Sequence, residues 1–219
     1  MIQNFQTNLN DIKGKLIQLG LGLVEANELI LSALGDCDAS KFTEARSKIK
    51  NVNSKTDDID NAIIKVLALY TPEARDLRQV IAYLKITNEL ARASSNTRSF
   101  IRGFVGVCKD VDTQTITEYA VPMQTSTVAA LKSTISMLSC DDDDEIQDIY
   151  NDVLIEENKT DDLYEMVERN LTLQAKDASN FEKFHKMLRA LRKSGKIAAR
   201  SISIANLLVY AKVGGNFRN

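Results

Sequence analysis

Residues that interrupt helices are few in this chain of 219 residues. It contains two prolines, Pro72 and Pro122, nine glycines and no tryptophan. Alanine, leucine, isoleucine and lysine are frequent instead, and such a composition favours long α-helices over strands and turns. We therefore expect an all-α protein.

Histidine and cysteine are also scarce, which bears on the chemistry that the chain can perform. An odd number of cysteines at unrelated spacings (Cys37, Cys108 and Cys140) does not predict a disulfide framework. We expect Cys37 and Cys140 to be ordinary loop thiols. A zinc site is not predicted, because His185 has no second histidine and no nearby cysteine pair. The sequence has no nucleophile–base pair and no glycine-rich phosphate loop, so we predict no enzymatic activity and no cofactor.

Neither a strong net charge nor a long apolar run is evident. The formal net charge of −2 argues against nucleic acid as a major partner, because phosphate binding requires a concentrated basic surface. We find no segment with the roughly 18–20 uncharged apolar residues that a membrane span needs. The start of the chain lacks the basic residues and apolar run of a secretory signal. A soluble, cytoplasmic protein is therefore predicted.

An internal repeat is the most informative feature that the chain does have. The segment Lys55-Thr56-Asp57-Asp58 recurs unchanged 104 residues later (159 − 55) as Lys159-Thr160-Asp161-Asp162. Other positions keep the same register without gaps, such as Leu84 with Leu188. A fixed internal period indicates one structural unit used twice, and here the unit has the size of a small domain.

Each half divides into three stretches with helical periodicity. We predict helices over residues 2–34, 41–70 and 73–107 in the first half, and over 114–138, 144–173 and 180–212 in the second. Such helices bury their apolar stripes best as antiparallel bundles. The prediction is six long helices arranged as two tandem three-helix bundles, residues 1–108 and 109–219, packed side by side. Faces left over on such helices are compatible with a homodimer.

The predicted helix boundaries carry capping residues, and the helices carry apolar stripes. Thr71-Pro72-Glu73 suits a helix start, with Pro72 as the first helical residue. The acidic segments 36–40 and 140–144 suit the starts of the second and fifth helices, and Gly214-Gly215 suits the end of the last. The apolar stripes of the third and sixth helices include Leu77, Val80, Ile81 and Leu84, and Phe181, Phe184, Leu188, Leu191 and Ile202.

The third predicted helix resembles a known family. The segment Thr71-Pro72-Glu73-Ala74-Arg75-Asp76-Leu77-Arg78, followed by Ile81-Ala82-Tyr83-Leu84-Lys85-Ile86, is similar to the third helix of the PhoU family, and the ending Tyr210-Ala211-Lys212-Val213-Gly214 is similar to that family's close. The resemblance implies tandem three-helix bundles over essentially the whole chain. It also implies a regulatory adaptor that contacts the ATPase of a phosphate ABC transporter and a sensor histidine kinase, reaching the membrane only through these partners.

Four charged residues of the third predicted helix are the candidate partner-binding residues. Asp76, Arg78, Lys85 and Arg92 project from its flanks, where the resemblance is strongest, and arginine is frequent at interfaces. An alternative is that they are solvated charges paired with residues one turn away.

The resemblance also implies a metal site, but this chain departs from its signature. The family carries a Glu-Arg-x-x-Asp step in each bundle, whose carboxylates bind a metal cluster. Here the two copies read Ala91-Arg92-Ala93-Ser94-Ser95 and Gly195-Lys196-Ile197-Ala198-Ala199, without either carboxylate. Spacing from Leu77 and Leu188 predicts that these small residues lie on buried stripes and serve tight helix packing. No metal ligand is therefore predicted.

Two other functions stay open. One is a metal-binding helical bundle for a hard cation, iron or zinc. It would be built on Glu157 and Asp161 and on their counterparts Asn53 and Asp57. Mg²⁺ or Ca²⁺ would need about six oxygens, more than these residues supply. These acids could instead be solvated, or could form ion pairs from Asp57 to Arg92 and from Asp161 to Lys196. The other function is an adaptor on the same fold for a different transporter.

Overall fold

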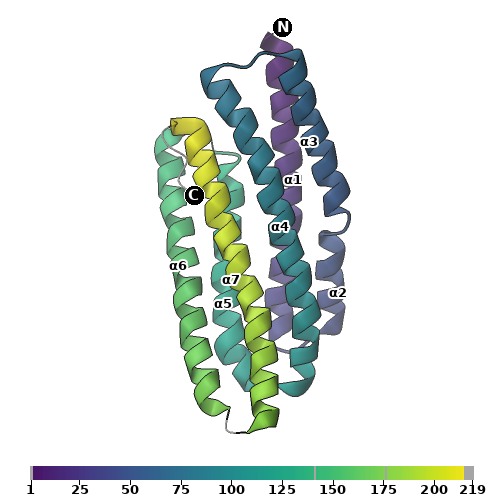
Figure 1. Ribbon diagram of the computed structural model, residues 1–219, viewed down its shortest axis with the longest axis vertical. Helices are drawn as coiled ribbons and strands as arrows, with labels where there is room; N and C mark the ends of the chain where they lie inside the picture. Colours follow the sequence, from purple (N-terminus) through teal and green to yellow (C-terminus); the bar gives the residue numbers. More distant parts are fainter. Residues whose placement is uncertain (1, 141, 176, 215–219) are drawn as a thin grey trace.

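A computed structural model describes residues 2–140, 142–175 and 177–214 of the chain. Over this part the chain forms seven α-helices and no β-strand: α1 (Ile2–Leu34), α2 (Ala39–Lys48), α3 (Val52–Leu69), α4 (Ala74–Asp110), α5 (Thr113–Met137), α6 (Asp143–Gln174) and α7 (Ala178–Val213). The helices run up and down along the long axis of the molecule (Figure 1). The all-α prediction is confirmed.

The helix predicted over residues 41–70 is wrong in one respect, because the chain breaks it into α2 and α3. Asn51 stands between them with a φ of 59°, in the left-handed region that asparagine adopts more readily than most residues. The two helices follow one another along the same side of the molecule (Figure 1). The arrangement therefore keeps six helical rods, one of them interrupted.

Aspartates cap the helices as predicted, whereas the proline does not. The side chain of Asp38 accepts a hydrogen bond from the Ser40 amide at 2.8 Å, and that of Asp142 accepts one from the Asp144 amide at 2.8 Å. The prediction for Pro72 is wrong, because α4 begins two residues later, at Ala74. Gly214 follows α7 with a φ of 84°, which suits glycine. Gly215 and Asp141 lie outside the described residues.

The halves, α1–α4 and α5–α7, pack side by side along their length. Helix α4 lies against α7, and α1 lies against α5 (Figure 1). Helix α1 approaches α5 closely at Gly20, where an added Cβ would lie 3.0 Å from Ile135 Cγ1 and closer still to Cδ1, so the Ile135 side chain would have to move. The α3–α4 turn and the α6–α7 turn lie at opposite ends of the molecule. A domain boundary between residues 108 and 109 stays a prediction.

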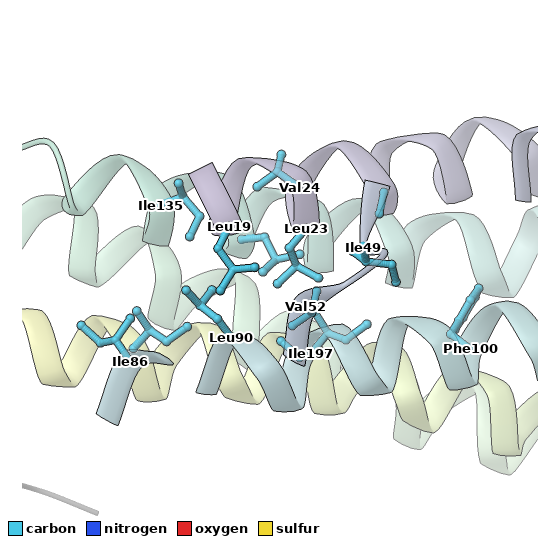
Figure 2. Close-up of a cluster of buried hydrophobic side chains, with 14 of the residues drawn as sticks. Leu19, Leu23, Val24, Ile49, Val52, Ile86, Leu90, Phe100, Ile135 and Ile197 are labelled. Atoms are coloured by element: carbon cyan, nitrogen blue, oxygen red, sulfur yellow. The ribbon is translucent and has the colours of Figure 1, made fainter. Parts of the chain in front are cut away.

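One hydrophobic core continues from the first half into the second. Leu23 of α1 and Leu90 of α4 are fully buried, as is Ile197 of α7 (Figure 2). Ile135 of α5 belongs to the same cluster. Burial of such side chains stabilises the fold by about 1.5–3 kcal/mol each, so the contact between the halves is part of the fold itself.

Two members of the predicted apolar stripes are exposed instead. Leu77 of α4 is 40% exposed and Phe181 of α7 is 58% exposed. Each lies in the first turn of its helix, directly after the turn that joins it to the preceding helix. Neighbouring helices do not cover these first turns as they cover the middle of the bundle, so a stripe with the right period is left open there.

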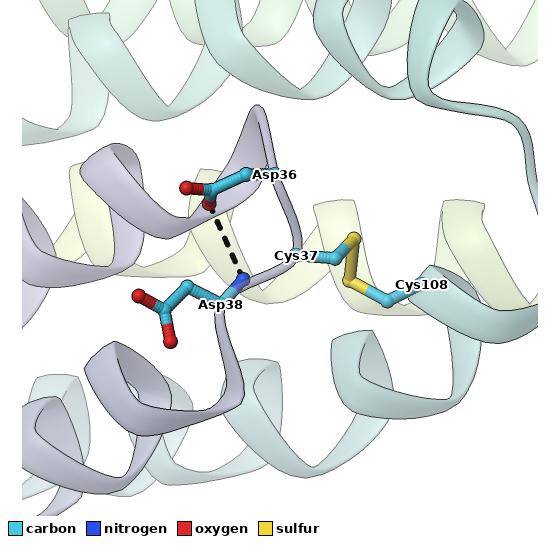
Figure 3. The surroundings of a disulfide bond; sticks show 4 residues. All are labelled: Asp36, Cys37, Asp38 and Cys108. Carbon is cyan, nitrogen blue, oxygen red and sulfur yellow. Dashed lines mark hydrogen bonds between the residues drawn. A yellow bond between two sulfur atoms is a disulfide. The ribbon is translucent and has the colours of Figure 1, made fainter.

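The absence of a disulfide is also a wrong prediction. Cys37, in the turn after α1, is bonded to Cys108 in the last turn of α4, with their Cα atoms 5.6 Å apart (Figure 3). Up-and-down packing brings this turn beside the end of α4, which the 71-residue spacing does not reveal. Cys140 is a free thiol in the loop between α5 and α6, as predicted, but it is buried, and its Sγ donates to the backbone oxygen of Asp142.

Helix α1 also differs from expectation in its apolar character. By length and composition alone, Asn4–Leu34 would suit a membrane span. Half of its apolar window is buried inside the molecule, and Leu16, Leu23 and Ile30 of this helix are fully buried. Core packing accounts for these residues.

Candidate functional site

The four residues predicted to bind partners lie along α4 in different surroundings. Asp76, Lys85 and Arg92 are exposed, whereas Arg78 is half-buried. The guanidinium of Arg78 packs beside Gly214 at the end of α7, where an added Cβ would lie 3.6 Å from Nη2. The structure therefore places three of these side chains in solvent and uses the fourth to cover the end of the other half.

Arg92 belongs to a small charge cluster between the halves. Its Nη1 lies 3.6 Å from Glu89 Oε1, and the other oxygen of Glu89 accepts a hydrogen bond from Arg200 Nη1 of α7 at 2.9 Å. In the described part of the chain, Asp57 does not pair with Arg92 and Asp161 does not pair with Lys196. Glu89, rather than Asp57, is thus the carboxylate that pairs with Arg92, and through Arg200 it links α4 to α7.

The small residues of the altered signature do not lie fully inside the bundle. Ala91, Gly195 and Ala199 are half-buried, and Ser95 is exposed. An added Cβ at Gly195 would meet Met123 Cε at 3.4 Å, which is ordinary contact rather than a clash. The prediction that these residues serve helix packing therefore holds for Ala91, which packs against the core, and is wrong for the exposed Ser95. Ser95 lines a groove between α2 and α4, and Gly195 and Ala199 line another between α6 and α7.

The groove between α6 and α7, called here the mixed groove, has a volume of about 330 Å³ and carries charges of both signs. Its lining residues are Glu157, Asp161, Tyr164, Glu168, Arg192, Gly195, Lys196 and Ala199. Burial and the neighbouring Asp161 carboxylate raise the pKa of Glu157. Two carboxylates one helical turn apart therefore repel one another here.

The donor set of these grooves does not fit a metal cluster. Over the described ranges, no three histidine, cysteine, aspartate or glutamate side chains come close enough together to hold one ion. A hard cation needs about six oxygens, and most of them would have to come from carboxylates or carbonyls. Ser95 offers one hydroxyl, and Gly195 and Ala199 offer no side-chain ligand. The residues present do not match the family's metal chemistry.

The groove between α2 and α4 has a different lining, which sequence reasoning missed. Arg46 of α2 and Arg98 and Arg102 of α4 face it, together with Ser95 and Ser99. A signal for it was available, because Arg98 and Arg102 are four residues apart on one helix and share a face. We call it the basic groove.

A chain of buried polar side chains crosses from one half to the other. Gln124 Nε2 of α5 donates to Asn27 Oδ1 of α1 at 3.0 Å, and Asn27 Nδ2 donates to Thr97 Oγ1 of α4 at 3.2 Å. On the other side, Ser194 Oγ of α7 donates to Gln124 Oε1 at 2.8 Å and lies 2.8 Å from Thr127 Oγ1. All five residues are fully buried. Fully partnered buried networks fix one packing arrangement of the helices, so this network fixes how the two halves meet.

Comparison with known proteins finds similarity to PhoU proteins both in sequence and in fold. Residues 16–100 match the family model of the PhoU domain. A phosphate-specific transport system accessory protein PhoU homolog of Pseudomonas aeruginosa is 29% identical over 110 residues, and one of Pseudomonas putida is 27% identical over 110 residues. Each match covers 49% of this chain and, respectively, 45% and 42% of the relative, so the aligned part spans less than half of these proteins.

Two solved structures extend the likeness to nearly the whole fold. PhoU from Pseudomonas aeruginosa has a TM-score of 0.85 at 20% identity, with 96% of this chain and 100% of that one covered. The phosphate transport system regulatory protein PhoU from Streptococcus pneumoniae has a TM-score of 0.81 at 18% identity, with 98% and 99% covered. Residues 16–100 of this chain are thus similar to the PhoU domain, and the chain as a whole shares the fold of the two PhoU structures.

Proposed function

We propose that this chain is a regulatory accessory protein of phosphate uptake and of phosphate-responsive signalling. The relatives that it matches are named as accessory proteins of a phosphate-specific transport system. Its action is that of an adaptor, which holds partner proteins by surface contact and makes or breaks no bond. The partners are the ATPase of a phosphate ABC transporter and a sensor histidine kinase, met at the cytoplasmic side of the membrane.

Exposed apolar side chains at both ends of the molecule carry this proposal. Leu69 and Leu77 flank the α3–α4 turn and are 60% and 40% exposed. Leu173 and Phe181 flank the α6–α7 turn and are 73% and 58% exposed. Each pair stands at matching positions of the repeat, 104 residues apart. Apolar side chains that are exposed next to one another at a turn form a patch that a partner protein can cover.

The surroundings of these tips suit protein contacts. Asp76 lies beside Leu77, and Lys85 follows two turns later on the same helix. At the other tip, the His185 ring stacks on Phe181 with ring centroids 5.8 Å apart. Apolar centres with charged and aromatic neighbours resemble the centre and rim of protein interfaces. Because the two tips lie at opposite ends (Figure 1), one molecule can meet two partners at once.

The test is isolation of the tagged protein from its own host grown with ample phosphate, followed by mass spectrometry of what accompanies it. We expect enrichment of a phosphate-transporter ATPase or a sensor kinase, and loss of that enrichment in the double variant Leu77→Ser, Phe181→Ser. Ile155→Ser is the matched control, since Ile155 is 51% exposed in the middle of α6. Enrichment of a different transporter would move the function, and equal loss in the control would contradict the role of the tips.

A further inference from the structure

The basic groove lies between α2 and α4 in the first half of the molecule. Its volume is about 600 Å³, and Arg46, Arg98 and Arg102 line it. A second hollow of about 430 Å³ adjoins it, since Arg46 and Arg98 line both, and adds Lys50. Three arginines from two helices and Lys50 from the turn after α2 therefore face adjoining hollows of one concave surface.

These cations are not neutralised by the protein. Within the ranges that the structure describes, no carboxylate forms an ion pair with Arg46, Lys50, Arg98 or Arg102. Arg98 is held in place, because its Nη1 donates to the Ile49 backbone oxygen at 3.2 Å. Like charges gathered in a concave surface repel one another and attract anions. The groove is thus arranged for a ligand with several negative charges.

The rest of the lining adds hydroxyl groups and an apolar floor. Ser95 and Ser99 present hydroxyls from the same face of α4 as Arg98 and Arg102. Phe42 and Ile101, both buried, form the floor, and Phe42 packs towards Phe104 with centroids 6.3 Å apart. Arginine with hydroxyl donors is the usual protein equipment for phosphate oxygens, whereas an apolar floor suits the organic part of a ligand.

We propose that the basic groove binds a phosphorylated organic anion of the nucleoside-phosphate class. Its volume lies within the range of about 300–1,000 Å³ typical of small-molecule sites and is far larger than a single orthophosphate needs. The arginines hold the phosphates, and the apolar floor holds the base. Ser95, where the PhoU family carries a metal-binding carboxylate by resemblance, here contributes a hydroxyl to anion binding. The inference does not rest on the proposed adaptor function, because binding is a property of the isolated chain.

The experiment is isothermal titration calorimetry of the full chain with ATP, orthophosphate and adenosine as probes, without added metal. We expect saturable binding of ATP, weaker binding of orthophosphate and none of adenosine. The double variant Arg46→Gln, Arg102→Gln should lower ATP affinity about tenfold or more, since each charge-assisted hydrogen bond contributes on this scale. Both side chains are exposed, so the variant is expected to keep its helical circular dichroism spectrum.

Arg169→Gln is the matched control, because Arg169 is exposed on α6 and lines neither groove. It should bind ATP as the unaltered chain does. Absence of ATP binding would overturn the proposal, and so would equal loss of affinity in the control. Orthophosphate binding as tight as that of ATP would overturn the assignment of an organic ligand. Retained ATP affinity in a folded double variant would move the binding away from this groove and overturn it as well.

Discussion

The first half of the molecule lines its groove with Arg46, Arg98 and Arg102, whereas the second half lines its groove with acids as well as bases. Equivalent positions of the repeat, Ser95 in the first half and Ala199 in the second, line the two grooves. From these positions the grooves extend in opposite directions along α4 and α7. Both positions lack the acidic side chain that the family resemblance implies. The two halves thus share a helical arrangement and differ in the charges that line their grooves.

The halves also differ in how they are held. A disulfide ties the α1–α2 turn to α4 in the first half, whereas Cys140, near the corresponding turn of the second half, is a buried free thiol. What the halves share is the contact between them: a common core and the polar chain through Gln124. The halves thus differ in groove charge and in covalent linkage but share one core.

Breaking the contact between the halves should have the largest effect. Gln124→Ala removes the partner of both Asn27 and Ser194 and leaves a buried cavity, so we expect a loss of about 4 kcal/mol in the free energy of unfolding. Urea denaturation followed by circular dichroism measures it. Gln114→Ala, the same change at an exposed position of α5, should have little effect. Similar losses in both variants would contradict a structural role for the polar chain.

Removing the disulfide should have the next largest effect and should act on the first half. Cys108→Ser opens a loop of 71 residues, which we expect to cost about 3 kcal/mol and to lower Tm by about 10 °C. Scanning calorimetry with and without reductant measures this. Reductant should lower the Tm of the unaltered chain but leave that of Cys108→Ser unchanged. A Tm of the unaltered chain that does not respond to reductant would contradict the bond.

Restoring carboxylates should sharpen the contrast between the grooves. The double variant Gly195→Glu, Ala199→Asp adds two acids to the mixed groove beside Glu157 and Asp161, and a Cβ at Gly195 meets ordinary contact distances. We expect it to bind Mn²⁺, because four carboxylates approach the oxygen count of a hard cation. The matched change at the equivalent positions of the first half, Ala91→Glu with Ser95→Asp, should bind less, because Ser95 lies among arginines. Elemental analysis after dialysis against Mn²⁺ decides this, and equal uptake by both variants would contradict the contrast.

Neutralising one acid of the mixed groove should have the smallest effect. Burial and Asp161 raise the pKa of Glu157 above the ordinary value of 4.5. The folded state therefore binds this proton more tightly than the unfolded state, and its stabilising contribution, complete below pH 4.5, is lost as the pH rises through the folded pKa. Glu157→Gln should raise Tm slightly at pH 7 and flatten its fall above pH 4.5. The exposed Glu165→Gln should show neither change, and a lowered Tm in Glu157→Gln would contradict the sign.

Local sequence patterns predicted what local physics decides. Asp38 and Asp142 cap helices as expected, since a cap depends on residues two or three positions away. The break at Asn51 was missed because asparagine is also tolerated inside helices, so its left-handed backbone depends on how α2 and α3 pack. The bond from Cys37 to Cys108 was missed for a similar reason, because only the packing of the helices brings the two residues together.

The grooves were predictable only in part. The missing carboxylates at Ala91, Ser95, Gly195 and Ala199 were evident from the sequence. Periodicity predicted that these residues are buried, whereas Ser95 is exposed and the other three are half-buried. A helical stripe specifies which residues share a face and does not specify how far the neighbouring helix extends over it. The same uncertainty hid the exposure of Leu77 at the end of the bundle. The basic groove needed two helices to be placed against one another.

The central claim, regulation of phosphate uptake, is tested most directly by the phosphate-starvation response in the host. We predict that deleting the coding sequence raises this response in phosphate-rich medium, measured as transcript levels of the phosphate transporter genes. Restoring the unaltered chain should return the response to its low level, and restoring Leu77→Ser, Phe181→Ser should not. Transcript levels that stay unchanged on deletion, at high and at low phosphate, would contradict the claim.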